Sequence, residues 1–120
     1  MPDPKFLLLY VDDPAASAAF YRDLFGREPV EASPTFVMFA LDGGPMLGLW
    51  SRRTVEPAAA AGGGGAELAV ADAAVDATFA DWTGRGMTIV QRPTTMDCGR
   101  TFVALDPDGH RLRVFAPAAP

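Results

Sequence analysis

The sequence predicts an α+β fold built from two β-α-β-β-β modules. Strand-length apolar runs alternate with helical stripes, turns containing Gly and Pro separate them, and the pattern of the first half returns in the second. A shift of 59 residues superposes Asp13 on Asp72 and Phe20 on Phe79. The 120 residues, of which 49% are hydrophobic, suffice for a single domain over residues 1–120 with a core of its own.

The first module is expected over about residues 4–55. An apolar run at 6–11 has the length of a strand, and Asp13 is an N-cap candidate before a proline suited to the first helical position. A helix is therefore predicted to begin at Pro14 and to end at Gly26, a typical C-terminal glycine. Its predicted apolar stripe consists of Ala16, Phe20, Tyr21, Leu24 and Phe25.

A hairpin follows the helix. The apolar runs Thr35 to Leu41 and Met46 to Trp50 are separated by Asp-Gly-Gly-Pro at residues 42–45, where glycine permits a tight reversal. The alanine- and glycine-rich segment at about residues 56–66 offers no side chains to pack and is predicted to link the two modules.

The second module, expected over about residues 67–117, repeats this order. Its first strand is predicted at Glu67 to Ala71, with Asp72 as the cap of a helix that ends before Gly84. The helix would bury Val75, Phe79 and Trp82, and strands are predicted at Met87 to Gln91, Thr101 to Leu105 and Arg111 to Phe115, the last two joined by a turn at 106–109.

Charge and cysteine content exclude some classes of protein. The net charge of −5 disfavours nucleic acid as a partner. Cys98 is the single cysteine and has no internal disulfide partner, and the N-terminus lacks a secretion signal, so a cytoplasmic location is expected. No apolar run is long enough to cross a bilayer. No motif supports a reactive role for Cys98.

Two segments carry a family resemblance. Residues 13–21 read Asp-Pro-Ala-Ala-Ser-Ala-Ala-Phe-Tyr, and Asp-Pro-Asp-Gly-His at 106–110 precedes the final strand. Together they resemble the glyoxalase/bleomycin-resistance/extradiol-dioxygenase group, the vicinal oxygen chelate superfamily. This resemblance implies mixed sheets that curl around a ligand cleft, completed in a homodimer.

Shorter segments resemble one branch of that group. They include Leu-Tyr-Val at 9–11, Phe-Tyr-Arg at 20–22, Leu-Trp-Ser at 49–51 and Gly-Arg-Thr-Phe at 99–102. They are most similar to phenazine-antibiotic resistance proteins, which bind their drug without a metal. The resemblance therefore implies no cofactor.

The positions that hold metal ligands in other members of the superfamily are occupied here by Phe6, Gly48, Glu67 and Arg113. A phenyl ring and a glycine donate no electron pair, and a guanidinium repels a cation, so no metal is expected. Glu67 and Arg113 would face one cavity as opposite charges and form an ion pair. The alternative is that the two side chains do not meet.

Apolar side chains on alternating strand positions would line the ligand cleft. An indole offers a flat surface and methionine adapts its shape, while Gly48 leaves room, which suits a planar aromatic guest. Ordinary core packing is the alternative for each residue. The candidates are Phe6, Leu8, Met46 and above all Trp50, with Phe39 as a further candidate whose facing is undetermined.

Polar candidates lie in the predicted loop at residues 94–100. There Asp97 and Arg100 have the chemistry to hold the polar edge of a guest, with Arg100 as the anion partner. Alternatively, Arg100 pairs with Asp97. His110, the single histidine, has no second histidine to build a hydrolase triad with, and a structural or surface role is expected.

The function expected from these features is metal-independent binding and sequestration of a planar aromatic small molecule, similar to a phenazine antibiotic, by a protein that is not an enzyme. One alternative is a metal-dependent lyase, isomerase or dioxygenase of the same superfamily. Another is a structural or regulatory protein whose cavity is filled by its own side chains.

Overall fold

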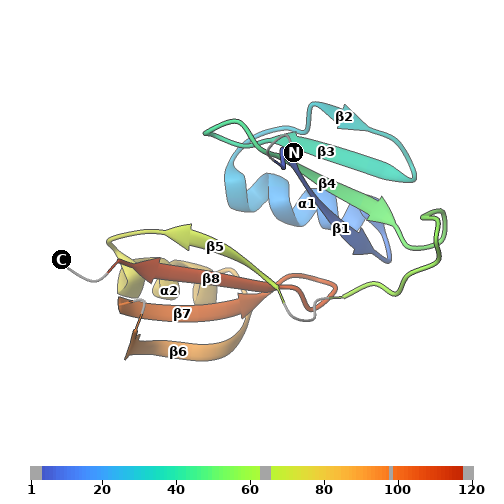
Figure 1. Ribbon diagram of the computed structural model, residues 1–120. Helices are drawn as coiled ribbons and strands as arrows, with labels where there is room; N and C mark the ends of the chain where they lie inside the picture. Colours follow the sequence, from blue (N-terminus) through green and yellow to red (C-terminus); the bar gives the residue numbers. More distant parts are fainter. Residues whose placement is uncertain (1–3, 63–65, 98, 118–120) are drawn as a thin grey trace. The chain divides into compact units, whose positions relative to one another are not determined.

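The chain forms two compact units, divided between residues 62 and 63. The computed structural model describes residues 4–62, 66–97 and 99–117. Within these ranges there are two helices and eight strands, arranged as two four-stranded mixed sheets (Figure 1). The predicted α+β fold is confirmed. Of the predicted linker at 56–66, residues 63–65 lie outside the described part of the chain, as does Cys98.

Unit 1 contains one helix and four strands. The strand order in its sheet is β1-β4-β3-β2, with β1 parallel to β4 and the other neighbours antiparallel. The predicted first strand, helix and hairpin are confirmed, and the two-residue strand β2, whose position was not predicted, completes the predicted β-α-β-β-β order. The elements are β1 (Phe6–Val11), α1 (Pro14–Phe25), β2 (Glu31–Ala32), β3 (Phe36–Ala40) and β4 (Met46–Ser51).

The ends of α1 follow from its capping residues. The Asp13 carboxylate accepts hydrogen bonds from the backbone N–H groups of Ala15 (3.0 Å) and Ala16 (3.3 Å). The helix therefore begins at Pro14, as predicted. At the other end Gly26 adopts φ +65°, a left-handed conformation that glycine enters without strain.

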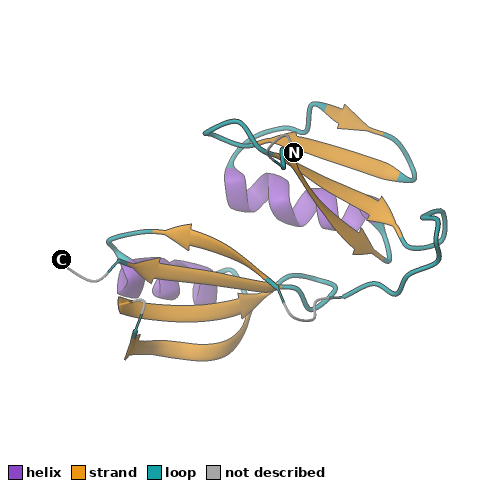
Figure 2. Ribbon diagram, in the orientation of Figure 1, coloured by secondary structure: helices purple, strands orange, loops and turns teal. Residues whose placement is uncertain are grey.

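One face of the sheet in unit 1 is covered by α1 (Figure 2). The helix buries Ser17, Ala18 and Tyr21. The predicted stripe was wrong in one member, because Ala16 is exposed and the small side chains at 17 and 18 take the contact with the sheet instead. The strand residues buried on this side are Val11, Val37, Phe39, Leu47 and Leu49.

Unit 2 repeats this architecture. Its sheet has the order β5-β8-β7-β6, with β5 parallel to β8 and the other neighbours antiparallel. Trp82 and Phe79 of its helix pack edge-to-face against Phe102, with ring centroids 5.3 and 5.4 Å apart. The elements are β5 (Glu67–Ala71), α2 (Val75–Gly84), β6 (Thr88–Met96), β7 (Gly99–Leu105) and β8 (Arg111–Ala116).

Two local predictions in unit 2 were wrong. Asp72 is not the N-cap of α2; Ala74 occupies that position, and the Asp72 carboxylate accepts from the Ala74 N–H (2.8 Å) and the Thr78 hydroxyl (2.6 Å). Strand β6 runs on to Met96, five residues beyond the predicted end. Pro93 is tolerated because β6 is an edge strand whose register is irregular between Gln91 and Thr94.

The turn between β7 and β8 is organised by a buried carboxylate. Asp106 Oδ1 accepts from the backbone N–H groups of Asp108 (2.9 Å) and His110 (2.8 Å). Its Oδ2 lies 2.7 Å from His110 Nδ1, and the two side chains are 0% and 8% exposed. His110 is thus a structural residue of this turn. Neither helix in the described ranges has the length and apolarity needed to span a membrane.

Candidate functional site

The sheet of unit 1 presents apolar side chains on the face opposite α1. Successive strand residues point to opposite faces, so the neighbours of the buried core positions lie together on this side. Several are exposed although large and apolar: Phe6 is 60% and Leu8 41% accessible. We call this surface the aromatic face; it consists of Phe6, Leu8, Tyr10, Phe36, Met38, Met46, Gly48 and Trp50.

Trp50 lies within the aromatic face between two other rings. It pairs with Tyr10 across β1 and with Phe36 across β3 in the strand register. The ring centroids are 6.5 Å and 6.2 Å away, both in edge-to-face geometry. Trp50 is half-buried, so part of the indole remains accessible. The structure therefore brings together four predicted ligand residues: Phe6, Leu8, Met46 and Trp50.

Gly48 does not leave the open space that its sequence position suggests. A Cβ atom placed there would lie 2.6 Å from Leu8 Cδ2 and 2.9 Å from Phe36 Cζ. These two side chains close over the glycine, so the expectation of room for a guest directly above Gly48 was wrong. The glycine instead allows Leu8 and Phe36 to approach the sheet closely.

Phe39 does not belong to this face. It is completely buried on the helix side of β3, where its ring packs edge-to-face against Phe25 at 5.8 Å. The prediction that it lines the ligand site was wrong, because the pleat places it one position out of phase with Phe36 and Met38. Phe39 is therefore a residue of the hydrophobic core between α1 and the sheet.

The corresponding face of the sheet in unit 2 carries a cluster of charged and polar side chains. Glu67 and Arg113 form a two-point ion pair, with Nε 2.7 Å from Oε1 and Nη2 3.1 Å from Oε2. The Arg113 Nη1 also donates to Gln91 Oε1 (3.1 Å) and Thr101 Oγ1 (3.2 Å). The direct contact between Glu67 and Arg113 exists; its place in a ligand cavity stays a prediction.

The ion pair lowers the pKa of Glu67. The hydrogen bond from Arg113 holds the pKa of Glu67 below its ordinary value, and Arg111, 3.5 Å from Oε2, adds to the effect. Burial opposes the shift without reversing it. A carboxyl whose pKa is lower in the folded state stabilises the fold above its unfolded pKa.

This shift predicts a pH dependence of stability. The wild type should exceed Glu67→Gln in free energy of unfolding above about pH 4.5, the ordinary pKa of this carboxyl. The difference should shrink as the pH falls further, because protonation removes the ionic contribution in the wild type alone. Urea unfolding of both proteins across this range measures it, and a difference that grows on acidification contradicts the assignment.

Arg100 is engaged away from Asp97. Its Nε and Nη2 donate to the two carboxylate oxygens of Asp76 on α2, at 2.7 and 2.8 Å. This contact raises the pKa of Arg100 and lowers that of Asp76. The alternative of an Arg100–Asp97 pair was therefore wrong, and the segment expected to be a loop is the end of β6 and the start of β7.

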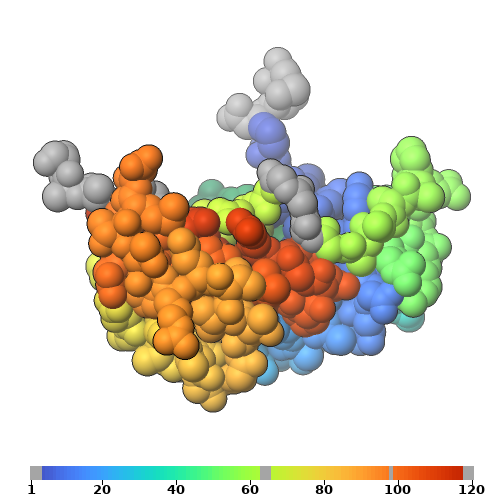
Figure 3. Space-filling view, turned by 90° about the horizontal axis from the view of Figure 1, so that it is seen from below, coloured from blue at the N-terminus to red at the C-terminus, as the bar shows by residue number. Residues whose placement is uncertain are grey.

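A pocket of about 480 Å³ lies at the β6–β7 turn, lined by Thr95, Met96, Asp97 and Arg113. It is a shallow hollow that is largely open to solvent rather than an enclosed cavity. The orange segment that contains the end of β6 lies at the surface of unit 2 (Figure 3). The predicted residue Asp97 and Arg113 thus line the same hollow, a combination that sequence spacing did not indicate.

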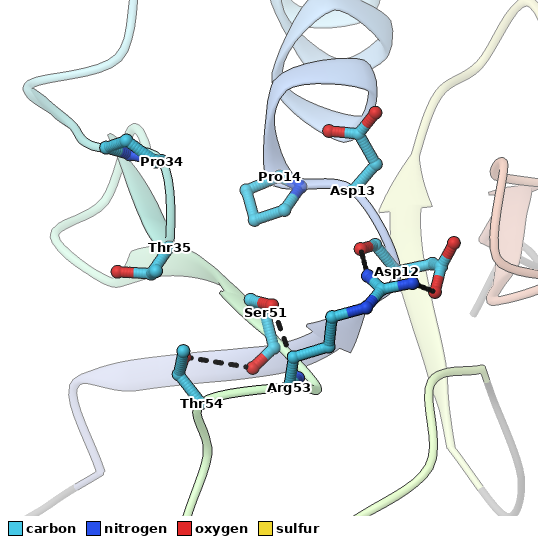
Figure 4. A pocket seen from close by; sticks show the side chains of 8 residues that line it. All are labelled: Asp12, Asp13, Pro14, Pro34, Thr35, Ser51, Arg53 and Thr54. Atoms are coloured by element: carbon cyan, nitrogen blue, oxygen red, sulfur yellow. Dashed lines mark hydrogen bonds and ion pairs between the residues drawn. The ribbon is translucent and has the colours of Figure 1, made fainter.

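A second pocket, of about 470 Å³, lies in unit 1 where β1 and β4 end and α1 begins. The Arg53 side chain points toward Asp12 in this region (Figure 4) and contacts its carbonyl oxygen and its carboxylate at 2.6 and 3.0 Å. Arg52 binds the same carboxylate at 2.7 Å, and both arginines lower the pKa of Asp12. None of the predicted ligand residues lines this pocket.

The four positions aligned with metal ligands do not fit a metal. Phe6 and Gly48 offer no donor atom, and both carboxylate oxygens of Glu67 accept hydrogen bonds from Arg113. Elsewhere among residues 4–62, 66–97 and 99–117, no three His, Cys, Asp or Glu side chains gather in a way that would hold an ion.

Comparison with known proteins gives consistent matches. A family described as the Glyoxalase/Bleomycin resistance protein/Dioxygenase superfamily matches residues 5–114. The phenazine antibiotic resistance protein EhpR of Enterobacter agglomerans is 35% identical over 128 aligned positions, covering 92% of this chain and 89% of that protein.

Solved structures agree with this match. The solution structure of protein ATC0852 from Agrobacterium tumefaciens is 55% identical, with a TM-score of 0.90 and coverage of 99% of this chain and 100% of that one. A lactoylglutathione lyase from Agrobacterium tumefaciens is 25% identical, with a TM-score of 0.71 and coverage of 95% and 92%.

Proposed function

The chain belongs to the glyoxalase/bleomycin resistance protein/dioxygenase superfamily, and from this membership we propose that it binds and sequesters a planar aromatic antibiotic of the phenazine type. Binding needs no metal in this proposal, because the four aligned ligand positions do not suit one. The similarity to EhpR supports antibiotic resistance as the biological outcome. Sequestration would take place in the cytoplasm.

The observation that carries the proposal is the aromatic face. A planar guest stacked on Trp50 would be flanked by Tyr10 and Phe36, whose rings stand edge-to-face to the indole. The flat indole matches the shape of a planar guest, and burial of the exposed side chains of Phe6 and Leu8 would add favourable apolar contact area. This arrangement suits stacking, and no covalent step is required.

The same apolar surface also favours association of the chain with a second copy of itself. The exposed residues Phe6, Leu8 and Tyr10 form part of a contiguous apolar surface. In a dimer, a second copy would cover this surface with the guest held in the cleft between the two copies. We therefore include a homodimer in the proposal. Sedimentation equilibrium of the purified protein tests this part, and a monomer at all concentrations contradicts it.

We predict that Trp50→Ala weakens phenazine binding by about tenfold or more, which corresponds to about 1.4 kcal/mol. The substitution removes the indole on which the guest would stack and leaves the other side chains of the aromatic face in place. Equilibrium dialysis of metal-analysed protein against phenazine gives the affinities. The fluorescence of the wild type should be quenched in a saturable manner over the same concentration range.

Trp82 provides the matched control. It is buried against Phe102 in unit 2, so Trp82→Phe removes an indole without touching the aromatic face. Trp82→Phe should retain both affinity and quenching, whereas Trp50→Ala should show weakened affinity and lose the quenching. Equal losses in the two variants contradict stacking on Trp50. Stoichiometric co-purified metal without phenazine binding supports a metal-dependent enzyme instead.

A further inference from the structure

We propose that Gly48 determines the specificity of the aromatic face for guests with three fused rings, because it lets the ends of the Leu8 and Phe36 side chains lie close to the sheet beside Trp50. The inference rests on the proposed function, since it concerns the size of the guest that this face takes. All of these residues belong to β1, β3 and β4 of unit 1. Gly48 would not contact the guest itself; it would act by positioning its two neighbours.

The first step concerns the size of the indole. An indole has two fused rings, so a guest with three rings that stacks on Trp50 extends beyond it. Tyr10 and Phe36, the register partners of Trp50, do not continue the indole plane sideways, because their rings stand at 66° and 88° to it. Within β4, which ends at Ser51, the next residue on this face is Gly48, about 7 Å along the strand. The third ring of the guest therefore needs support above Gly48.

The second step concerns what lies above Gly48. The glycine pairs with Leu8 on β1 and with Met38 on β3. A Cβ atom at this position would lie 2.6 Å from Leu8 Cδ2 and 2.9 and 3.1 Å from two atoms of the Phe36 ring. Two apolar side-chain ends thus occupy the volume that a side chain at residue 48 would need. They continue the apolar surface of Trp50 along the strand and offer contact area to a third ring.

The third step concerns the effect of a side chain at residue 48. A Cβ contact shorter than 3.0 Å requires one of the two groups to move. The atoms in the way are the ends of Leu8, which is 41% exposed, and of the half-buried Phe36, so they can swing outward without disturbing the backbone. Outward is the side from which the guest approaches, since α1 covers the other face of the sheet (Figure 2). Gly48→Ala would therefore leave the fold intact and obstruct the third ring.

The test compares phenazine with quinoxaline, which keeps the nitrogen-containing ring and has one fused benzene ring fewer. Both compounds are uncharged near neutral pH, and the indole alone can cover a guest of two rings. Equilibrium dialysis should show that the wild type prefers phenazine. Gly48→Ala should weaken phenazine binding by about tenfold while changing quinoxaline binding by about twofold or less. Urea unfolding of the same preparations should show that the variant is folded.

Gly84→Ala is the matched control. Gly84 is the last residue of α2 in unit 2, and its φ is not positive. A Cβ atom added there would meet none of the described atoms within 4 Å. The substitution therefore adds the same methyl group without a collision. The preference for phenazine over quinoxaline should stay at the wild-type value.

Leu8→Ala tests the inference independently of the folding of Gly48→Ala. It removes the Cδ2 atom above the glycine and leaves a gap, so it should weaken phenazine binding more than quinoxaline binding. A methyl group at residue 48 would fill part of this gap and no longer collide with residue 8. The double variant Leu8→Ala/Gly48→Ala should therefore bind phenazine more tightly than the two single effects combined would give, because the effects of residues in contact are not additive.

Three outcomes overturn the inference while phenazine still binds in a Trp50-dependent manner, so that the proposed function stands. In the first, the wild type shows no preference for phenazine, or the folded Gly48→Ala variant keeps this preference unchanged. In the second, Gly84→Ala shifts the preference as far as Gly48→Ala. In the third, the effects of Leu8→Ala and Gly48→Ala on phenazine binding are additive. If the wild type binds neither compound, the proposed function fails as well.

Discussion

Replacing Phe39 by alanine is expected to lower the free energy of unfolding of unit 1 by about 3–5 kcal/mol. The side chain is completely buried and packs against Phe25 of α1, so truncation leaves a cavity between helix and sheet. Because whole domains are stable by about 5–15 kcal/mol, this loss removes a large part of the stability. Urea unfolding followed by the fluorescence of Trp50 measures it.

Phe6→Ala is the matched control for this experiment. Phe6 lies in the same sheet but on the aromatic face, where it is 60% exposed. Its removal should change stability by about 0.5 kcal/mol or less, as is usual for surface positions, while weakening phenazine binding. Similar destabilisation by the two substitutions contradicts the assignment of Phe39 to the core and Phe6 to the ligand surface.

The second large effect is expected at Asp106. Asp106→Ala removes the acceptor of two backbone N–H groups and of the His110 ring, all at a turn where the carboxylate and imidazole are buried. Each buried polar group left without a partner costs about 1–3 kcal/mol. We expect a total loss of about 2–4 kcal/mol, measured by denaturant unfolding with Trp82 as the reporter in unit 2.

Asp97→Ala controls for the loss of a negative charge near the same sheet. Asp97 is exposed at the β6–β7 turn, so its removal should leave stability within about 0.5 kcal/mol of the wild type. If Asp106→Ala and Asp97→Ala have equal melting temperatures, the turn between β7 and β8 does not depend on the Asp106 carboxylate for its stability.

The elements of this fold were predictable where local chemistry decides them. Asp13 and Gly26 determine the ends of α1 through capping and a left-handed φ, and both signals are visible in the sequence. The end of β6 was not predictable in this way. Its last residues are held by pairing with β7, and Pro93 looks like a strand terminator unless the edge position of β6 is known.

The candidate site was predictable only in part, for the same reason. The alternation of Phe6 and Leu8 on one strand, and of Met46 and Trp50 on another, identifies residues that share a face. The facing of Phe39 depends on the parity of β3 relative to β4, which a sequence does not show. The partner of Arg100 is also remote, because Asp76 lies on a helix 24 residues earlier.

The parallel pairing of the first strand with the last in each unit has a consequence for synthesis of the chain. Strand β1 is synthesised before its partner β4, because Phe6 pairs with Met46. The apolar strand therefore stays unpaired until β4 has been made and the sheet of unit 1 can form. Unit 1 is then complete while unit 2 is still being made. Strand β5 likewise pairs with β8 (Arg111–Ala116), so unit 2 can close only after β8 has been synthesised. Interrupted synthesis therefore leaves unit 2 with an unpaired strand, a hazard for aggregation.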